Sequence, residues 1–498
     1  MKWLVWACGL LLPALALAEP PQLQTHADTP ALLYWSLSAL AGDPHIDGPT
    51  WRAWWAKELP ADARDVEAIA KFGHLKSLYR GRLVDVRGRT NPWVPVPPPP
   101  SYRLDVRFAA LFLGARDLPE LLRRAEVLLA EPDLLTLQQV VAVVGPRLQQ
   151  FIGQAKWLAQ FRSDFDVFST RQQLPQFLDR VAQLLGATQT GVVAVHFVPV
   201  GPGQVLHGRR LGGHVVVEVR ADDKPLHRSD VVAHEVVHWL QERAGNDDDP
   251  ALIQALFGGG DVRAARAWEL HSEGIATAIG QGAWQQQASP AEFERARNKP
   301  GGWYVDNAIE PYAKAIYPAV AAALPGSATL TALVPALLAG VDAVPAPRKL
   351  ADVLHRYCLI SDFRDAAWMD AQWWAAIPPR AVWRVDLEAL SQWTQAAQAT
   401  TLVVLATWSQ LARLPSADAK VLGLPVPRKS DTGAATWLAP RSGGAVVLVV
   451  AAPDEAQLSQ AAGAVASGGL PAPGWRVVTK SPSGFDKTNK AGTLPTGR

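Results

Sequence analysis

The sequence predicts an α+β fold in which a mostly helical N-terminal region precedes a mixed core and a small C-terminal α/β module. Three observations predict this class. Apolar residues recur at three- and four-residue spacing through much of 19–190. Two apolar runs typical of strands follow at 191–200 and 213–220. Beyond about residue 378, two further buried-strand patterns are followed by a helical pattern, which indicates an α/β module.

The segment 1–18 has the features of a secretory signal peptide. Lys2 precedes a short apolar run, and Ala16-Leu17-Ala18 provides a cleavage pattern of small residues. The run is too short to span a bilayer comfortably. We therefore expect cleavage before Glu19 and a periplasmic or secreted protein, with a retained N-terminal anchor helix as the alternative. No later segment is apolar for long enough to cross a membrane.

The remaining elements follow in order along the chain. Within the helical N-terminal region 19–190, clear helical patterns lie at 31–37 and 118–129, and the proline run 95–100 predicts a stiff spacer. The core, over 191–345, combines the two strands with helices, expected near 230–243, 262–280, 312–324 and 329–338. A helical connection is expected over 346–378. The α/β module spans 379–479, with strands at 401–406 and 445–451, a helix at 454–462, and a polar, disordered tail at 480–498.

Charge and cysteine content argue against nucleic-acid binding, an internal disulfide and a cysteine-based metal site. The 498 residues include 48 basic and 46 acidic side chains, for a net charge of +2, and no basic run stands out. Electrostatics therefore offers no argument for nucleic-acid binding. Signal removal would take Cys8 with it and leave Cys358 as the only cysteine, so neither an internal disulfide nor a cysteine-based metal site is expected.

The segment His234-Glu235-Val236-Val237-His238 is the strongest chemical signal in the chain. On a helix, positions i and i+4 lie on one face, so both imidazoles can bind one zinc ion. Glu235 is rotated by about 100° from His234 and can act as a general base on a water molecule without binding the metal. The apolar flanks predict a helix buried behind the site, and Ser229 is a plausible N-cap.

A catalytic zinc needs a third protein ligand and one open position. The helix predicted at 262–280 offers Glu273, with Glu269 one turn earlier on the same face as ligand or supporting carboxylate, and His271 on another face. The segment Glu273-Gly274-Ile275-Ala276 is similar to the Glu-Gly-x-Ala segment of the gluzincin metallopeptidases, above all the M1-like aminopeptidases. The resemblance implies a zincin-like catalytic core in which His234, His238 and Glu273 bind zinc and Glu235 is the catalytic base.

The chain also departs from the aminopeptidase pattern. His238 and Glu273 are separated by 34 residues (273 − 238 − 1), more than in that family. No Gly-x-Met-Glu-Asn-type segment for gripping a free amino terminus lies upstream. The resemblance therefore carries the metal chemistry and leaves aminopeptidase specificity aside.

Two further features are candidates for contact with a substrate. Gluzincins often use a Tyr or His on a later helix to stabilise the oxyanion. Tyr312 is the preferred candidate, with Tyr317 and His355 as alternatives. The strand predicted at 213–220 is either a core strand or an edge strand that pairs with an extended substrate backbone.

These patterns predict an exported zinc metallopeptidase that acts on a peptide or protein substrate. One alternative is a zinc hydrolase of cell-wall peptides. Another is a non-catalytic protein in which the metal site supports binding or assembly. The oligomeric state and the role of the C-terminal module do not follow from the sequence.

Overall fold

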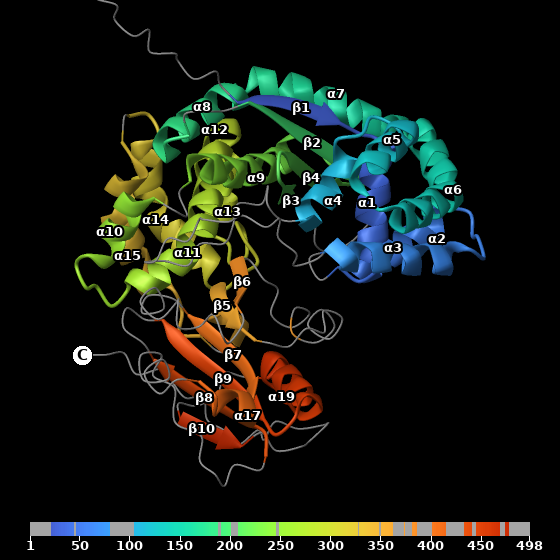
Figure 1. The fold of residues 1–498 in the computed structure, drawn as a ribbon. Coiled ribbons are helices and arrows are strands. Elements are labelled where there is room, and N and C mark those ends of the chain that lie inside the picture. Colours follow the sequence, from blue (N-terminus) through green and yellow to red (C-terminus); the bar gives the residue numbers. More distant parts are fainter. Residues whose placement is uncertain are drawn as a thin grey trace, which may run out of the picture.

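The chain folds as an α+β protein, as predicted; helices predominate, and the described strands form two mixed sheets (Figure 1). The computed structural model describes residues 21–43, 46–79, 104–187, 191–200, 208–245, 249–326, 328–347, 350–361, 373, 381–385, 401–414, 433–440, 445–468 and 474–477. The expected signal peptide at 1–18, the proline run at 95–100 and the tail at 480–498 lie outside these ranges. Within them, none of the helices combines the length and apolar character that a membrane-spanning segment needs.

The N-terminal region is mostly helical, as the sequence predicts. Its helices are α1 (Thr29–Leu40), α2 (Gly48–Glu58), α3 (Asp65–Tyr79), α4 (Leu104–Leu113), α5 (Leu118–Leu128), α6 (Glu131–Gln154), α7 (Lys156–Arg171) and α8 (Leu174–Leu185). The region also contains a strand that sequence analysis missed, β1 (Gln22–His26). Its five residues are mostly polar and half-buried, so they carry no apolar run that would identify a strand.

The first sheet has four strands in the order β1-β2-β4-β3. The predicted strands at 191–200 and 213–220 appear as β2 (Val192–Pro199) and β4 (His214–Val219), which pair in parallel. Val195 and Val217 belong to the core shared with α7, α8 and α9, whereas Val198 and Val216, on the opposite face, join the core of the N-terminal helices. Because both faces are covered, these strands read as continuous apolar runs.

Strand β4 is internal, which rules out one of the two readings of 213–220. It pairs with β2 on one side and with β3 (Gly208–Leu211) on the other, so its backbone is not free to bind a substrate. Gly212 and Gly213 form the turn of a tight hairpin between β3 and β4, where Gly212 has a φ of +65°. Among the described strands, the edge on this side of the sheet is β3.

The helices after the first sheet carry the predicted chemistry. They are α9 (Leu226–Ala244), α10 (Pro250–Phe257), α11 (Ala264–Thr277), the π-helix η2 (Ala278–Trp284), α12 (Gln285–Ala288), α13 (Pro290–Arg297), α14 (Ile309–Ala323), η3 (Leu330–Leu333), α15 (Val334–Gly340) and η4 (Val341–Ala343).

Helix α9 begins earlier than predicted, and the expected N-cap at Ser229 is wrong. The helix starts at Leu226, with Pro225 at the cap position and no capping side chain. The Ser229 hydroxyl, one turn inside the helix, donates to the Leu226 carbonyl and accepts from the indole nitrogen of Trp284. Ser229 therefore joins α9 to the end of η2, a role that local sequence does not reveal.

The second sheet has six strands in the order β10-β8-β9-β7-β5-β6. They are β5 (Arg356–Ile360), β6 (Ala381–Val385), β7 (Leu402–Thr407), β8 (Ala435–Pro440), β9 (Val446–Ala452) and β10 (Gly474–Val477). Helix α19 (Glu455–Ser467) packs on β7 and β9, and the short α17 (Trp408–Leu411) follows β7 (Figure 1). The predicted strands at 401–406 and 445–451 and the helix at 454–462 are thereby confirmed.

The sheet extends further toward the N-terminus than expected. Strand β5 falls within 346–378, where the sequence suggested a helical connection, and it pairs in parallel with both β6 and β7. A short helical turn, η5 (Leu350–Asp352), precedes β5. Five residues are too few to distinguish a strand from a helical turn by periodicity.

Gly274 allows α11 and α14 to pack closely, and its substitution tests this packing. A Cβ atom there would overlap the ring of Tyr312, which is fully buried. We expect Gly274→Ala to lower the free energy of unfolding by about 1–3 kcal/mol, as overpacking does. Gly153 in α6, where a Cβ would meet nothing, is the matched control, and Gly153→Ala should raise stability by about 0.5–1 kcal/mol. Urea unfolding measures both, and equal effects would contradict this account of the packing.

Candidate metal centre

Helix α9 carries the His-Glu-x-x-His motif on a buried face. His234 and His238 retain only 6% and 15% of their side-chain exposure. Val232, Val236 and Leu240 are fully buried in the core behind them, as the apolar flanks predict. The helical repeat brings the two Nε2 atoms to 3.2 Å from each other.

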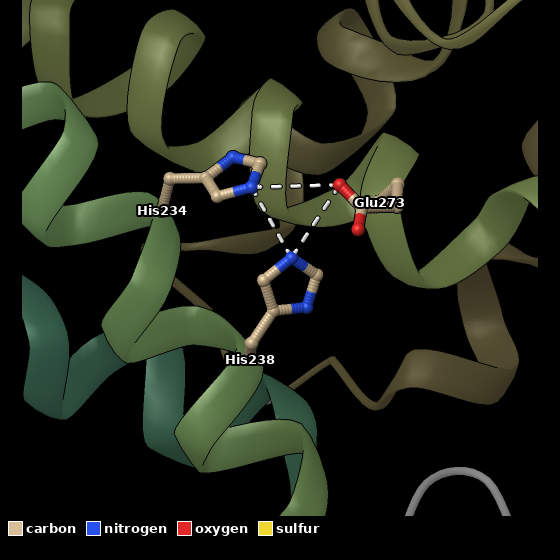
Figure 2. A group of neighbouring side chains, drawn as sticks. All are labelled: His234, His238 and Glu273. Carbon is tan, nitrogen blue, oxygen red and sulfur yellow. Dashed lines mark hydrogen bonds and ion pairs between the residues drawn. The ribbon is translucent and has the colours of Figure 1, made fainter. Parts of the chain in front are cut away.

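The third group of the site is Glu273 of α11 (Figure 2). Its Oε2 atom lies 3.6 Å from the Nε2 of His234 and 3.6 Å from the Nε2 of His238. Figure 2 shows the two imidazoles and the carboxylate pointing toward one another from two different helices. His234, His238 and Glu273 are called the triad below.

The size of the triad suits a transition-metal ion. A point equidistant from three atoms that are 3.2, 3.6 and 3.6 Å apart lies about 2.0 Å from each of them. Zinc binds imidazole nitrogen and carboxylate oxygen at about 2.0–2.2 Å. A mixed set of two imidazoles and one carboxylate also suits other divalent transition ions, so these three side chains could hold a metal ion of this class.

Glutamine side chains orient both imidazoles. The Nδ1 atom of His234 lies 3.3 Å from Oε1 of Gln281, and that of His238 lies 3.0 Å from Oε1 of Gln241. Gln241 donates to the carbonyl of Ser272 and accepts from its hydroxyl, which defines the orientation of the amide. With an acceptor at each Nδ1, both rings carry their proton there and turn an Nε2 lone pair toward the centre of the triad.

The close approach of α9 and η2 depends on Gly280. A Cβ there would lie 2.7 Å from the carbonyl oxygen of Asp230 and 3.0 Å from the Cβ of His234. The chain changes from α-helix to π-helix at Ala278, just before this contact. Because a π-helix shifts the positions of the side chains that follow, Gln281 faces His234 from this segment.

The triad attracts positive charge. Burial lowers the pKa of His238, but the charge and hydrogen bond of Glu273 and the charge of Glu235 act in the opposite direction. The net result is a pKa above the usual value for histidine. The negative charges of Glu273 and Glu235 would stabilise either a proton or a metal cation at the centre of the triad.

Glu235 lies beside β3, the edge strand of the first sheet. It is half-buried on α9, and a Cβ at Gly208 would come within 3.2 Å of its Oε1 atom and would overlap Val231. Glycine at the start of β3 therefore lets the strand backbone approach the carboxylate closely. Glu235 therefore lies beside the edge strand β3 in space and directly follows His234 in the sequence.

Glu269, the alternative third ligand, has other partners. Its Oε2 accepts from the guanidinium of Arg266 at 2.8 Å, and its Oε1 accepts from the hydroxyl of Thr401. His271 is fully buried, stacks on Trp268 and contacts the Trp268 carbonyl through Nδ1. Of the carboxylates on α11, Glu273 is the one that the structure brings to the two histidines.

The preferred oxyanion residue, Tyr312, lies in the hydrophobic core. Its ring is fully buried between Gly274 and Gly340. Within the described part of the chain its hydroxyl has no hydrogen-bond partner. Burial raises the Tyr312 pKa far above its usual value. This position does not support the proposed catalytic role, and a helical pattern alone could not distinguish a core tyrosine from one at the site.

The two alternatives to Tyr312 also contact other groups. Tyr317 donates to Oε1 of Gln286 at 2.5 Å and packs against Trp303. His355 is 3% exposed and lies between Arg266 and Asp306. Neither residue belongs to the triad.

Tyr304 is the site residue that sequence analysis missed. Its hydroxyl donates to Oε2 of Glu273 at 3.2 Å, the same oxygen that faces the histidines. Its ring stacks on His234 with the centroids 5.7 Å apart. Tyr304 lies in the non-helical segment between α13 and α14, where no periodic pattern marks it. The signal available was a tyrosine just before the helix that packs on α11.

A second group of histidines meets on the first sheet, where pairing of β1, β2 and β4 brings them together. His26 stacks on His196, whose Nε2 lies 3.1 Å from Nδ1 of His214 and whose Nδ1 lies 3.3 Å from Oδ2 of Asp28. Burial, aided by the charge of His196, lowers the His214 pKa to about 4. These groups form a chain of contacts, and within the described ranges only the triad brings three potential metal ligands to one point.

Comparison with known proteins offers no guide to function, so the functional assignment depends on the geometry of the triad. No protein-family model, no curated protein and no solved structure matches the chain. The argument for a metal centre therefore rests on the triad, on the glutamines that orient its histidines and on Tyr304.

The two carboxylates of α11 predict different responses to substitution. Glu273→Gln removes the charged oxygen of the triad, and we expect the affinity for Zn²⁺ to fall by at least about 100-fold. Glu269→Gln changes the partner of Arg266, and the variant protein should still bind one metal ion per chain. Competition with a chromophoric chelator measures both constants. A larger loss for Glu269→Gln would identify Glu269 as the ligand and contradict the assignment.

Proposed function

We propose that this protein is an exported zinc-dependent metallopeptidase that hydrolyses peptide bonds. The observation that carries the proposal is the triad, whose spacing suits zinc, with Glu235 on the same helix as two of its members. The signal-peptide pattern of 1–18 supports export. The proposed substrate is a peptide or protein, and no feature of the sequence supports nucleic-acid binding.

Glu235 is the proposed general base. Zinc, when bound, supplies Lewis acidity that polarises the substrate carbonyl and makes water a stronger acid. The carboxylate of Glu235 takes a proton from the attacking water and delivers it to the leaving amine nitrogen. Its half-buried position supports this role, because partial burial limits access of bulk water to the carboxylate, and Gly208 lets the backbone of β3 lie close beside it.

Tyr304 takes the role that the sequence suggested for Tyr312. Its hydroxyl is 3.2 Å from Glu273, so it lies close enough to the triad to donate to an oxyanion that develops beside it. The segment that carries it is held by Glu310, whose carboxylate accepts from the backbone nitrogens of Gly301 and Trp303 at 2.6 and 2.9 Å. A donor held in place before the reaction requires little reorganisation during it.

Strand β3 is the proposed binding surface for an extended substrate. It replaces 213–220 in this role, because β4 is internal to the sheet. Backbone pairing with an edge strand would give affinity without strict sequence preference. Arg210 on β3 pairs with Glu242 of α9, and Arg209 donates to Asp43 at 3.2 Å, so both arginines serve to hold the strand against its neighbours.

Glu235→Gln tests the mechanism. We expect the variant to bind zinc and to lose on the order of 10²–10⁴-fold in turnover, because the amide cannot accept the proton. Casein, short peptides and peptidoglycan are the substrates to assay. Glu294→Gln, which changes an exposed carboxylate on α13, is the control and should leave turnover unchanged. Full turnover in Glu235→Gln would contradict the mechanism. Stoichiometric zinc without turnover of any substrate by the wild-type protein would favour a binding or assembly role.

Tyr304→Phe and Tyr312→Phe form a matched pair that tests the oxyanion assignment. Loss of one oxyanion donor typically costs on the order of 10²–10³-fold in kcat, and we expect this loss for Tyr304→Phe. Tyr312→Phe removes a hydroxyl buried in the core and should leave kcat unchanged. Steady-state kinetics on a peptide substrate separates the two, and the opposite order of effects would restore Tyr312 as the catalytic residue.

A further inference from the structure

The C-terminal sheet contacts two elements of the site. One is α11, which carries the third ligand Glu273, and the other is the segment that carries Tyr304. Thr401, directly before β7, donates from its hydroxyl to Glu269 of α11. His355, directly before β5, contacts Asp306, which lies two residues after Tyr304. Because β5 and β7 are parallel neighbours, these residues lie at the same end of the two strands. The N-terminal ends of β5 and β7 therefore meet both α11 and the segment that carries Tyr304.

The tautomer of His355 follows from its partners. Its Nδ1 lies 3.3 Å from the Nη1 atom of Arg266, and a guanidinium can only donate. Nδ1 is therefore the acceptor, and Nε2 carries the proton that is donated to Oδ1 of Asp306 at 3.2 Å. The imidazole is 3% exposed, so both hydrogen bonds are made away from bulk water.

Arg266 joins this histidine to α11. Its Nη1 donates to Oε2 of Glu269 at 2.8 Å, and its Nη2 donates to the carbonyl of Asp352 at 2.6 Å, in the turn before β5. Arg266 and Glu269 precede the ligand Glu273 on the same helix. The guanidinium therefore connects the ligand-bearing helix, the turn before β5 and His355.

Asp306 connects His355 to the segment that carries Tyr304. Its Oδ1 also accepts from the backbone nitrogens of Ala308 and Ile309, at 2.8 and 3.0 Å, where α14 begins. Glu310 holds the other side of the same segment, upstream of Tyr304, through Gly301 and Trp303. Tyr304 is thus positioned from both sides, and His355 contacts the downstream side.

These contacts form a closed ring. From α11 the ring runs through Arg266 to His355 and Asp306, along two residues of chain to Tyr304, and from the Tyr304 hydroxyl to Glu273, which returns it to α11. A closed ring restrains the distance between its members more strongly than a single contact does, because each link limits the movement of the next.

We propose that His355 is a positioning residue for the metal centre, through which the C-terminal sheet holds the Tyr304 hydroxyl on Glu273. The inference rests on the proposed metal centre and assigns a role to the C-terminal sheet. His355 is not a member of the triad, and the link to the ligand Glu273 on which the proposal rests runs through Asp306 and Tyr304. Loss of His355 should therefore have the same consequence for zinc binding as loss of the Tyr304 hydroxyl.

A double-mutant cycle on zinc affinity tests the proposal in the full-length protein. Competition with a chromophoric chelator gives the Zn²⁺ dissociation constants of wild type, Tyr304→Phe, His355→Ala and the double variant. We expect each single variant to bind zinc about 10-fold more weakly, which is the lower range for groups that orient metal ligands. The double variant should bind no more weakly than Tyr304→Phe, because both substitutions remove the same interaction.

The cycle has a conservative rescue and two controls. His355→Gln keeps one acceptor and one donor and should restore most of the affinity. His355→Phe, which keeps the volume, replaces His355→Ala if that variant does not fold. Tyr317→Phe removes a hydroxyl that contacts Gln286 outside the ring and should not change affinity. Circular dichroism establishes that each protein is folded.

Two results would overturn the proposal. The first is a double variant whose loss is the product of the single losses, because His355 and Tyr304 would then act independently. The second is a His355→Ala protein, or a His355→Phe protein used in its place, that binds zinc as tightly as wild type. Because the readout is metal affinity, either result leaves the hydrolytic assignment standing. Conversely, absence of peptidase activity would not affect the cycle.

Discussion

The constraint on which the structure of the site depends is the convergence of two imidazole nitrogens and one carboxylate oxygen within 3.6 Å in a mostly buried space. Two facing lone pairs and a carboxylate repel one another unless a cation lies between them. The chain therefore has to hold them from outside, which it does with Gln241 and Gln281 behind the histidines and Tyr304 on the carboxylate. Helices α9 and α11, the π-helix η2 and the non-helical segment before α14 supply these groups.

The rest of the fold holds the two helices at this separation. The first sheet has a helical core on each face, and α9 packs on one of these faces with its apolar side. Gly280 lets η2 approach α9, and Gly208 lets the edge strand approach Glu235. The second sheet supports α11 from the other side through Thr401 and Arg266. Elements far apart in the chain thus hold one small group of atoms in place.

Local chemistry explains which parts of this arrangement could be predicted from the sequence. His234 and His238 are one helical turn apart, so helical geometry alone aligns them, and Glu273 follows from a short motif resemblance. Tyr304 could not be predicted, because the hydrogen bonds of Glu310 and Asp306 place it and no repeat in its own segment does. The sequence could not reveal that Tyr312 lies in the core, because a buried helical tyrosine and a catalytic one share the same pattern. Strand β1 depends on pairing with the distant strand β2, which no local pattern encodes, and β4 is internal because β2 and β3 pair with its two sides.

The central claim is that His234, His238 and Glu273 together hold one zinc ion, and X-ray absorption at the zinc edge tests it most directly. The measurement is made on the purified protein after addition of one equivalent of Zn²⁺. The account predicts one tightly bound ion with two imidazole nitrogens and carboxylate or water oxygens at about 2.0–2.2 Å, and no sulfur. Failure to retain zinc, or a first shell with one imidazole or three, would contradict it.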